Sequence, residues 1–401
     1  MTFKNQIASI LIIAIFIYFN MACTNTPNGN SLPTPEGIPP IKPGSTPLPL
    51  HVEGKYIRDI NNKIVILKGV STPDLHAIYK GHRENPTGPY DPYGASTQAI
   101  FNYLETLTLP EWKNVKVVRL CIHPEICDET CRAGGGKHGW LVYNDPVGFF
   151  KYIIDPAVQY VKNLGKYVIV DWHYVGESWK KKNEENTVYF WNFISKRYAN
   201  DSSILFELFN EPGKGRWKDW QSYAQKWINC IRSGDWSIYN LPPTEPADNL
   251  ILVGAPHWSQ KLPHYINFNR SEDPNILLTG SNIAYTCHIY PAHRVPKWFA
   301  WTAKYAPAII SEWGYEVNAQ LPVKGTFSKW GKKFHDYLNS FDNVGWIAWC
   351  FDFIYRSIMF DSSWTLLGNG NTSPGTRYYH GPEDNYENYM GQFVIDWLNE
   401  K

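Results

Sequence analysis

The sequence has almost no excess of charge of either sign. Its 401 residues include 38 Lys and Arg and 37 Asp and Glu, which leaves a formal net charge of +1 at pH 7. A protein that binds nucleic acid usually carries a basic field that attracts phosphates, so this composition gives no support for nucleic acid as a partner.

Closely spaced histidine pairs are also missing. No His-x-His occurs in the chain, and a metal-dependent hydrolase usually needs such a pair or an Asp placed as a ligand. We therefore expect neither a metal nor a cofactor. A metal-dependent barrel hydrolase stays open as an alternative, because His123, His173, His257 and His288 all lie near the ends of predicted strands.

Cysteines are few, seven in all. Cys127 and Cys131 lie in a Gly-rich loop and are a candidate disulfide in an exported protein. Their spacing also fits half of a zinc site, but no second pair with suitable spacing follows. Four others lie among apolar residues and are predicted to be buried free thiols, namely Cys121, Cys230, Cys287 and Cys350.

The N-terminus has the pattern of a signal peptide. Lys4 precedes the apolar run IASILIIAIFIYF (7–19), which is too short for a comfortable membrane span. We expect a signal peptide over 1–22. Cys23 follows a small alanine and is a candidate for lipidation, although Asn20 departs from the aliphatic residue usual in lipoprotein signals. The prediction is export, either by secretion or as a lipoprotein anchored at the cell surface.

Residues 23–49 are rich in Pro, Gly, Ser, Thr and Asn and show no apolar periodicity. Such a composition is typical of a semi-extended tether outside the folded part. The folded domain is therefore predicted to cover 50–401.

Within that domain, short β-branched runs alternate with segments that have apolar residues at helical spacing. The predicted strands are 64–71, 115–123, 167–173, 204–210, 250–258, 283–290, 308–314 and 345–351. Nearly continuous hydrophobic strands between helices indicate a parallel sheet covered by helices, and eight such units fit a single (β/α)8 TIM barrel, of class α/β. An open doubly wound sheet is the alternative, weakened because KGVSTPDLH (68–76) has one glycine rather than a Gly-rich phosphate turn.

Polar and aromatic residues recur near the ends of these strands. They are Arg119, His123, Asp171, His173, Asn210, Glu211, His257, Trp258, His288, Tyr290, Glu312, Trp313, Trp346 and Trp349. In a barrel the C-terminal strand ends share one mouth, which carries the chemistry in enzymes with this fold. Glu211 and Glu312 would face each other there, and paired carboxylates across a cleft are what cleavage of a glycosidic bond requires.

Five motifs together resemble glycoside hydrolase family 5, the cellulase family. They are FELFNEP with Glu211, VIVDWH with His173, HIY with His288, SEWG with Glu312 and GWIAW with Trp349. The resemblance extends from about residue 50 to the C-terminus and implies a (β/α)8 barrel whose acid and nucleophile follow strands four and seven.

The resemblance also implies roles for individual residues. Glu211 would be the general acid/base and Glu312 the nucleophile of a retaining double displacement, with carboxyl groups about 5–5.5 Å apart. Arg119 would keep Glu312 ionised, whereas a more apolar setting would keep Glu211 protonated. Asn210 would bind the sugar 2-hydroxyl, and Tyr290 would donate to the nucleophile.

The other implied site residues are aromatic. His173 and His288 would line the subsite where the bond is cut, and Trp349 would stack under that sugar ring. Trp258 and Trp313 are weaker candidates for substrate contact, with core packing as the alternative for each.

The resemblance implies a retaining endo-β-1,4-glucanase that acts on β-linked polysaccharide, and a monomer is the default state. The loops 71–94 and 125–140 are longer than those of common endoglucanases, and loops at this face shape the cleft. A β-mannanase or another β-1,4- or β-1,3-glycanase is therefore the alternative. A non-catalytic glycan-binding lipoprotein is less favoured, because both glutamates are present.

Overall fold

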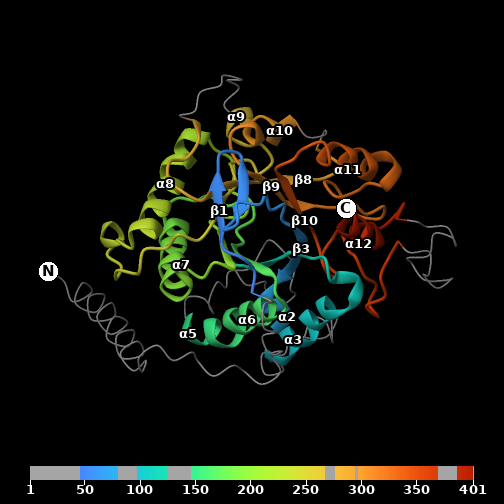
Figure 1. Ribbon diagram of the computed structural model, residues 1–401, viewed down its shortest axis with the longest axis horizontal. Coiled ribbons are helices and arrows are strands. Elements are labelled where there is room, and N and C mark those ends of the chain that lie inside the picture. Colours follow the sequence, from blue (N-terminus) through green and yellow to red (C-terminus); the bar gives the residue numbers. More distant parts are fainter. Residues whose placement is uncertain are drawn as a thin grey trace, which may run out of the picture. The chain divides into compact units, whose positions relative to one another are not determined.

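A closed barrel of eight parallel strands forms the centre of the molecule (Figure 1). Each strand pairs with the next in chain order, and the last pairs with the first. The strands are β3 (Lys68–Asp74), β4 (Val117–Ile122), β5 (Tyr167–Trp172), β6 (Ile204–Glu207), β7 (Ile251–Val253), β8 (Ile283–Ile289), β9 (Ala308–Trp313) and β10 (Val344–Ala348). The predicted TIM barrel is confirmed, and the open doubly wound alternative is wrong.

The structure is a computed structural model that describes residues 46–79, 97–124, 146–266, 276–293, 297–368 and 386–400. These residues belong to one compact unit that spans Pro39–Lys401. The predicted signal peptide, Cys23, Cys127 and Cys131 lie outside the described residues, as does most of both long loops. In the described part of the chain, no helix is long and apolar enough to cross a membrane.

Helices surround the barrel (Figure 1). They are α2 (Leu75–Tyr79), α3 (Thr97–Glu105), α5 (Pro146–Phe149), α6 (Asp155–Asn163), α7 (Lys182–Tyr198), α8 (Trp217–Ser233), α9 (Pro263–Ile266), α10 (Lys297–Ala300), α11 (Lys332–Leu338) and α12 (Gly391–Asn399). The buried residues of α8 include Trp217, Trp220, Ala224, Trp227 and Ile231. Their spacing of three and four residues places them on one helix face, which packs on the barrel.

Apart from Lys68 of β3, which is half-buried, the barrel strands are buried because helices cover their outer side. Every residue of β4, β5, β8 and β9 is buried. This explains the nearly continuous hydrophobic runs of the sequence and makes the few polar residues within them conspicuous.

Several strand boundaries differ from those predicted, among them the end of β6, which lies at Glu207 rather than 210. β3 begins at Lys68 rather than 64, β7 ends at Val253 rather than 258, and β10 ends at Ala348 rather than 351. After β7 the backbone enters a left-handed turn at His257. An apolar run does not reveal where a strand gives way to a loop of similar composition.

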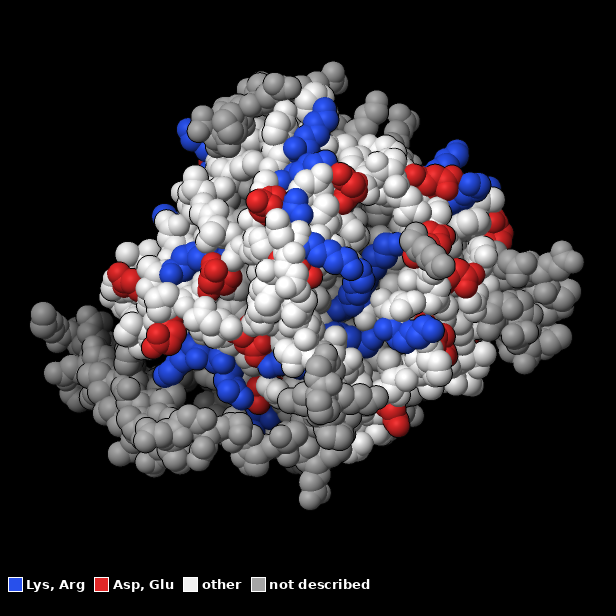
Figure 2. Space-filling view, viewed as in Figure 1, with Lys and Arg blue, Asp and Glu red and all other residues white. Residues whose placement is uncertain are grey.

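A β-hairpin covers the N-terminal end of the barrel. It consists of β1 (Leu50–Glu53) and β2 (Tyr56–Asp59), which lie in front of the barrel in Figure 1. Leu50, Val52 and Ile57 pack against the core cluster inside that end. On this face, positive and negative side chains are interspersed (Figure 2), in keeping with the net charge of +1.

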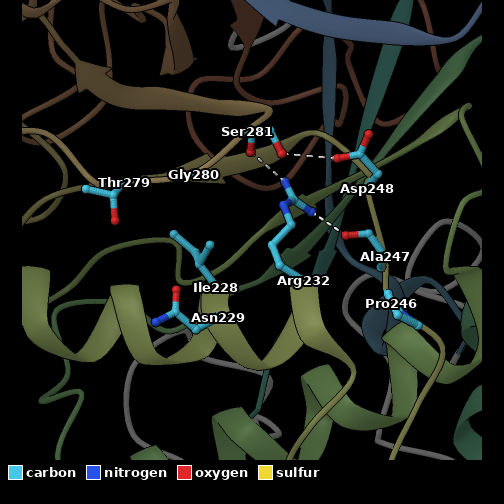
Figure 3. Close-up of a pocket in the computed structure, with 9 residues that line it drawn as sticks. All are labelled: Ile228, Asn229, Arg232, Pro246, Ala247, Asp248, Thr279, Gly280 and Ser281. Carbon is cyan, nitrogen blue, oxygen red and sulfur yellow. Dashed lines mark hydrogen bonds between the residues drawn. The ribbon is translucent and has the colours of Figure 1, made fainter.

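A cavity of about 370 Å³ lies at this same end, beside the residues that lead into β7 and β8. Arg232 of α8 lies in it and donates to the carbonyl oxygens of Ala247 and Ser281 (Figure 3). The guanidinium therefore ties together the two segments that enter these strands. Its place at the N-terminal end separates it from the mouth, where the predicted site residues gather.

Candidate active site

The two predicted glutamates meet at the C-terminal mouth of the barrel. Glu211 lies four residues after the last residue of β6, and Glu312 lies within β9. One carboxylate oxygen of each, together with one ring nitrogen of His288, forms a group whose members all lie within 4.8 Å of one another. Residues 101 positions apart in the sequence are thus brought to one point by the closure of the barrel.

His288 of β8 lies between the two carboxylates. Its Nδ1 is 2.7 Å from Oε1 of Glu211 and 3.3 Å from Oε2 of Glu312. The ring is fully buried, and burial lowers its pKa. A neutral imidazole is therefore in contact with both carboxyl groups.

Arg119 of β4 is the buried cation of the site. Its Nη1 donates to Oε1 of Glu312 at 3.0 Å, and its Nε donates to Oε2 of Glu207 at 2.6 Å. Its Nη2 donates to Oδ1 of Asn210 at 2.5 Å and lies 3.0 Å from Oδ2 of Asp171. Burial alone would lower the guanidinium pKa, but these carboxylates outweigh it and hold the pKa well above its ordinary value.

Burial also raises the pKa values of the two glutamates. That of Glu211 rises to about 8, because desolvation outweighs the opposing charge of Arg119. The pKa of Glu312 is raised by burial too, but His288 and the Arg119 guanidinium act against this. Glu312 also accepts a hydrogen bond from Tyr290 Oη to Oε2 at 2.8 Å, which favours its charged form. Glu211 is therefore the carboxyl that keeps its proton.

Two contributors to this network had no role assigned from the sequence. Glu207, the last residue of β6, is fully buried, and its Oε1 accepts from Ser311 Oγ at 3.0 Å. Ser311 Oγ is in turn 3.2 Å from Nε2 of His288. The available signal was a carboxylate inside the apolar run ILFELF, because an ionisable residue within a buried strand needs a charged partner.

Asp171 also had no assigned role, although the sequence places it at the end of β5. Its Oδ2 is 2.5 Å from Nδ1 of His173, and the same oxygen contacts Arg119. Burial raises the pKa of Asp171 to about 6 and lowers that of His173 well below its ordinary value. The aspartate thus connects His173 to the central arginine.

Aromatic rings line the mouth beside these groups. Trp349, just after β10, is half-buried and stacks on His173 with ring centroids 5.4 Å apart and an interplanar angle of 9°. Its Nε1 donates to the Arg356 carbonyl at 2.8 Å, which fixes the indole. Trp258 is half-buried as well, and its Nε1 lies only 2.4 Å from where a Cβ would stand at Gly176. Only a glycine leaves room for the indole there.

Trp313 does not lie at the mouth, so its prediction as a substrate contact is wrong. The residue is fully buried and packs against Phe334 of α11, Trp346 and Trp397 of α12. Successive side chains of a strand point to opposite faces, so Trp313 points to the helices while Glu312 points to the barrel interior. Trp346 lies on the eighth barrel strand, as predicted, and is buried in the same layer.

Two groups of described residues have donor atoms that could hold a metal ion. One is Glu211, His288 and Glu312, and the other is Cys121, Asp171 and His173. In the second group the Arg119 guanidinium lies 3.5 Å from Cys121 Sγ and 3.0 Å from Asp171. Burial raises the Cys121 thiol pKa well above its ordinary value. A bound cation there would have to displace the arginine, so this chemistry does not favour metal.

Comparison with known proteins gives a family match. The model of the family Cellulase (glycosyl hydrolase family 5) matches residues 111–353. Endoglucanase A of Butyrivibrio fibrisolvens is 27% identical over 242 residues, which are 60% of this chain and 45% of the relative. An endoglucanase of Clostridium saccharobutylicum is 25% identical over 353 residues, 86% of this chain and 64% of the relative. The chain thus spans about half the length of the curated relatives it matches.

Solved structures share the fold. A β-glucanase from Saccharophagus degradans, in complex with cellotetraose, has a TM-score of 0.62 at 20% sequence identity. The match covers 94% of this chain and 99% of the β-glucanase chain. The catalytic domain of Thermobifida fusca endoglucanase Cel5A has a TM-score of 0.58 at 20% sequence identity. That match covers 88% of this chain and 97% of the endoglucanase chain.

Proposed function

Because this chain belongs to glycoside hydrolase family 5, the cellulase family, we propose that it is a retaining endo-β-1,4-glucanase that hydrolyses internal bonds of β-glucans. One observation carries the proposal. Glu211 and Glu312 present carboxylate oxygens within 4.8 Å of each other at the barrel mouth. This separation supports a retaining mechanism, because an inverting pair needs about 6.5–9.5 Å between its carboxyl groups to admit a water.

In the first step, ionised Glu312 attacks the anomeric carbon while Glu211 gives its proton to the departing glycosidic oxygen. The bond from carbon to that oxygen breaks, and an ester forms between the sugar and Glu312. The raised pKa of Glu211, about 8, supports its role as the acid at neutral pH. Hydrogen bonds from Arg119 and Tyr290 stabilise the charged nucleophile.

In the second step, Glu211 acts as a base. It takes a proton from water, whose oxygen attacks the anomeric carbon and releases Glu312. His288 contacts both carboxyl groups and has a lowered pKa. It therefore remains neutral while the proton on Glu211 leaves and returns, and it keeps the two groups in place.

Three other residues are proposed to bind the sugar. Asn210 donates from Nδ2 to the Tyr174 carbonyl at 3.1 Å, which leaves its second N–H to donate to the 2-hydroxyl. Trp349 offers a flat apolar face beside His173 for stacking under the ring. Trp258 is proposed to extend this aromatic surface along the chain of sugars.

We further propose that residues 1–22 are a signal peptide and 23–49 a tether to the catalytic domain, 50–401. Export gives the enzyme access to polysaccharide outside the cell, and acylation at Cys23 would keep it at the surface. We retain monomer as the proposed oligomeric state. In this proposal the catalytic domain begins with β1, whose first residue is Leu50.

The test is release of reducing sugar from carboxymethyl cellulose, barley β-glucan, glucomannan, galactomannan and xyloglucan by the full chain. We expect activity on the glucans, with a loss of at least about 10³-fold in Glu211→Gln and Glu312→Gln because a member of the catalytic pair is removed. Glu105→Gln, on the exposed end of α3, is the matched control and should keep full activity. Preference for the mannans would move the proposal to a β-mannanase. Activity that survives both substitutions, or is abolished by a chelator, would refute the two-glutamate mechanism.

A further inference from the structure

Three consecutive residues after β7 have left-handed backbone conformations. The φ angles of His257, Trp258 and Ser259 are 67°, 59° and 50°. Residues with a Cβ adopt this region rarely and usually one at a time, because the Cβ approaches the backbone carbonyl. Such a turn persists only where surrounding contacts hold it, and clustered outliers of this kind occur at functional sites.

The left-handed turn 257–259 contacts the segment that carries Glu211. The backbone N–H of His257 donates to the Gly213 carbonyl, and that of Trp258 donates to the Pro212 carbonyl, each at 3.0 Å. The hydroxyl of Ser259 donates to the Asn210 carbonyl at 2.6 Å. Each residue of the turn thus makes one hydrogen bond to the segment 210–213.

The end of β5 and the loop after it hold the other side of the same segment. The N–H groups of Asn210 and Glu211 donate to the carbonyls of Trp172 and Tyr174, both at 3.0 Å. The Glu211 carbonyl accepts from Gly176 N, and Gly213 N donates to the Glu177 carbonyl, both at 2.8 Å. Every backbone N–H and carbonyl from Asn210 to Gly213 therefore has a partner, so that Glu211 is mounted on a fully braced loop.

Ser259 makes a second contact that its neighbours in the turn do not make. Its carbonyl accepts from the backbone N–H of His288 at 2.9 Å. The side chain is fully buried, and a Cβ at Gly254 would stand 2.1 Å from its Oγ, so the glycine leaves room for the hydroxyl. One residue thus connects the backbone of Asn210 to that of His288, whose ring contacts Glu211.

We propose that Ser259 is a positioning residue for the general acid. It fixes the distance between Glu211 and His288 by joining the loop of Glu211 to strand β8, and it acts without touching substrate. The inference rests on the proposed glucanase function. The Ser259 hydroxyl can be removed by substitution while the backbone of the turn is kept.

The test compares Ser259→Ala and Ser259→Gly with the wild type. Glycine adopts positive φ readily, so Ser259→Gly keeps the turn but removes the hydroxyl. This variant takes the place of Ser259→Ala in the test if the alanine variant fails to fold. The matched control is Ser203→Ala, because Ser203 is equally buried and also donates its hydroxyl at 2.6 Å, to Asp201 at the opposite end of β6.

The first readout is kcat/KM on substrates that differ in their need for an acid. On barley β-glucan we expect a loss of about 10- to 100-fold, because a small misplacement of a catalytic group is that costly. On 2,4-dinitrophenyl β-cellobioside, whose leaving group needs no proton, we expect kcat/KM to fall less than about 3-fold. Equal losses on both substrates would show that Ser259 supports the fold and does not position the acid. Either that result or no loss on β-glucan would overturn the proposal.

The second readout does not depend on activity. Hydrogen exchange of the Glu211 and Gly213 amides should be about 10-fold faster in both Ser259 variants than in Ser203→Ala, because the loop loses one of its ties. Unchanged exchange in both variants would overturn the proposal. If the wild type hydrolyses no polymer, the glucanase assignment fails, while the exchange result still decides whether Ser259 braces this loop.

Discussion

The raised pKa of Glu211 predicts that this residue, the proposed general acid, destabilises the folded protein at alkaline pH. Its ordinary pKa is 4.5, and in the folded protein the value is about 8. The folded state therefore binds this proton more tightly than the unfolded chain. Between these two values the unfolded state has lost the proton and the folded state retains it. Stability contributed by the bound proton is fully present below pH 4.5 and is lost as the pH rises toward 8.

The size of this effect follows from the two pKa values. They differ by about 3.5, and each pKa unit corresponds to 1.36 kcal/mol, which gives an upper limit of about 5 kcal/mol. The Glu211 side chain is 13% exposed, so solvent reduces the penalty. We expect about 2–3 kcal/mol in practice, because effective dielectric constants near such sites exceed those of a dry interior.

The experiment is urea denaturation of the wild type and Glu211→Gln at pH 4.5 and pH 8.5. Gln has nearly the same shape but does not ionise. Between pH 4.5 and pH 8.5 the wild type should therefore lose about 2–3 kcal/mol more free energy of unfolding than Glu211→Gln loses. Glu105→Gln controls for the loss of a carboxylate at an exposed position. A difference between the wild type and Glu211→Gln that is the same at both pH values would refute the reasoning, because it would show that ionisation of Glu211 is not penalised by the fold.

Three further predictions follow from the same site. The kcat/KM on β-glucan should fall as the pH rises through about 8, because Glu211 then loses the proton it must donate, and a pH profile without this limb would contradict the assignment. Arg119→Met should lower the free energy of unfolding by about 3–5 kcal/mol in urea titrations, because it leaves buried carboxylates without their cation, and a change under 1 kcal/mol would show that they are neutralised in another way. Trp349→Ala should raise KM on β-glucan about 10-fold through lost stacking, whereas Trp313→Phe should lower the melting temperature but leave KM unchanged, and the reverse pattern would refute their placement.

Much of this architecture was predictable from local patterns. Alternation of β-branched runs with helical segments predicts the barrel, because a parallel strand buried on both faces has to be apolar along its length. A run such as ILFELFNEP then reveals Glu211 just beyond a buried strand. Since all strands of such a barrel end at one mouth, order along the chain was enough to bring Glu211 and Glu312 together.

Other features depended on contacts that no local pattern contains. Glu207 reads as one charged residue in an apolar strand, and only the folded barrel places Arg119 and Ser311 beside it. Trp313 follows Glu312 directly, yet the pleat of the strand turns it toward α11 and α12. Neighbours in sequence thus received different roles through the direction of their side chains.

By itself, the sequence determined the barrel, its family and the two glutamates that meet at the mouth, because periodicity and residue type at strand ends are local properties. Only the tertiary structure decided how the acid is held. The left-handed turn at His257–Ser259 begins inside the run 250–258 that was predicted to be a strand, and its backbone is kept there by partners about 45 residues away along the chain, on the loop of Glu211. Conformations that are unfavourable for the residues themselves arise from such distant contacts, and those contacts exist only once the barrel has closed.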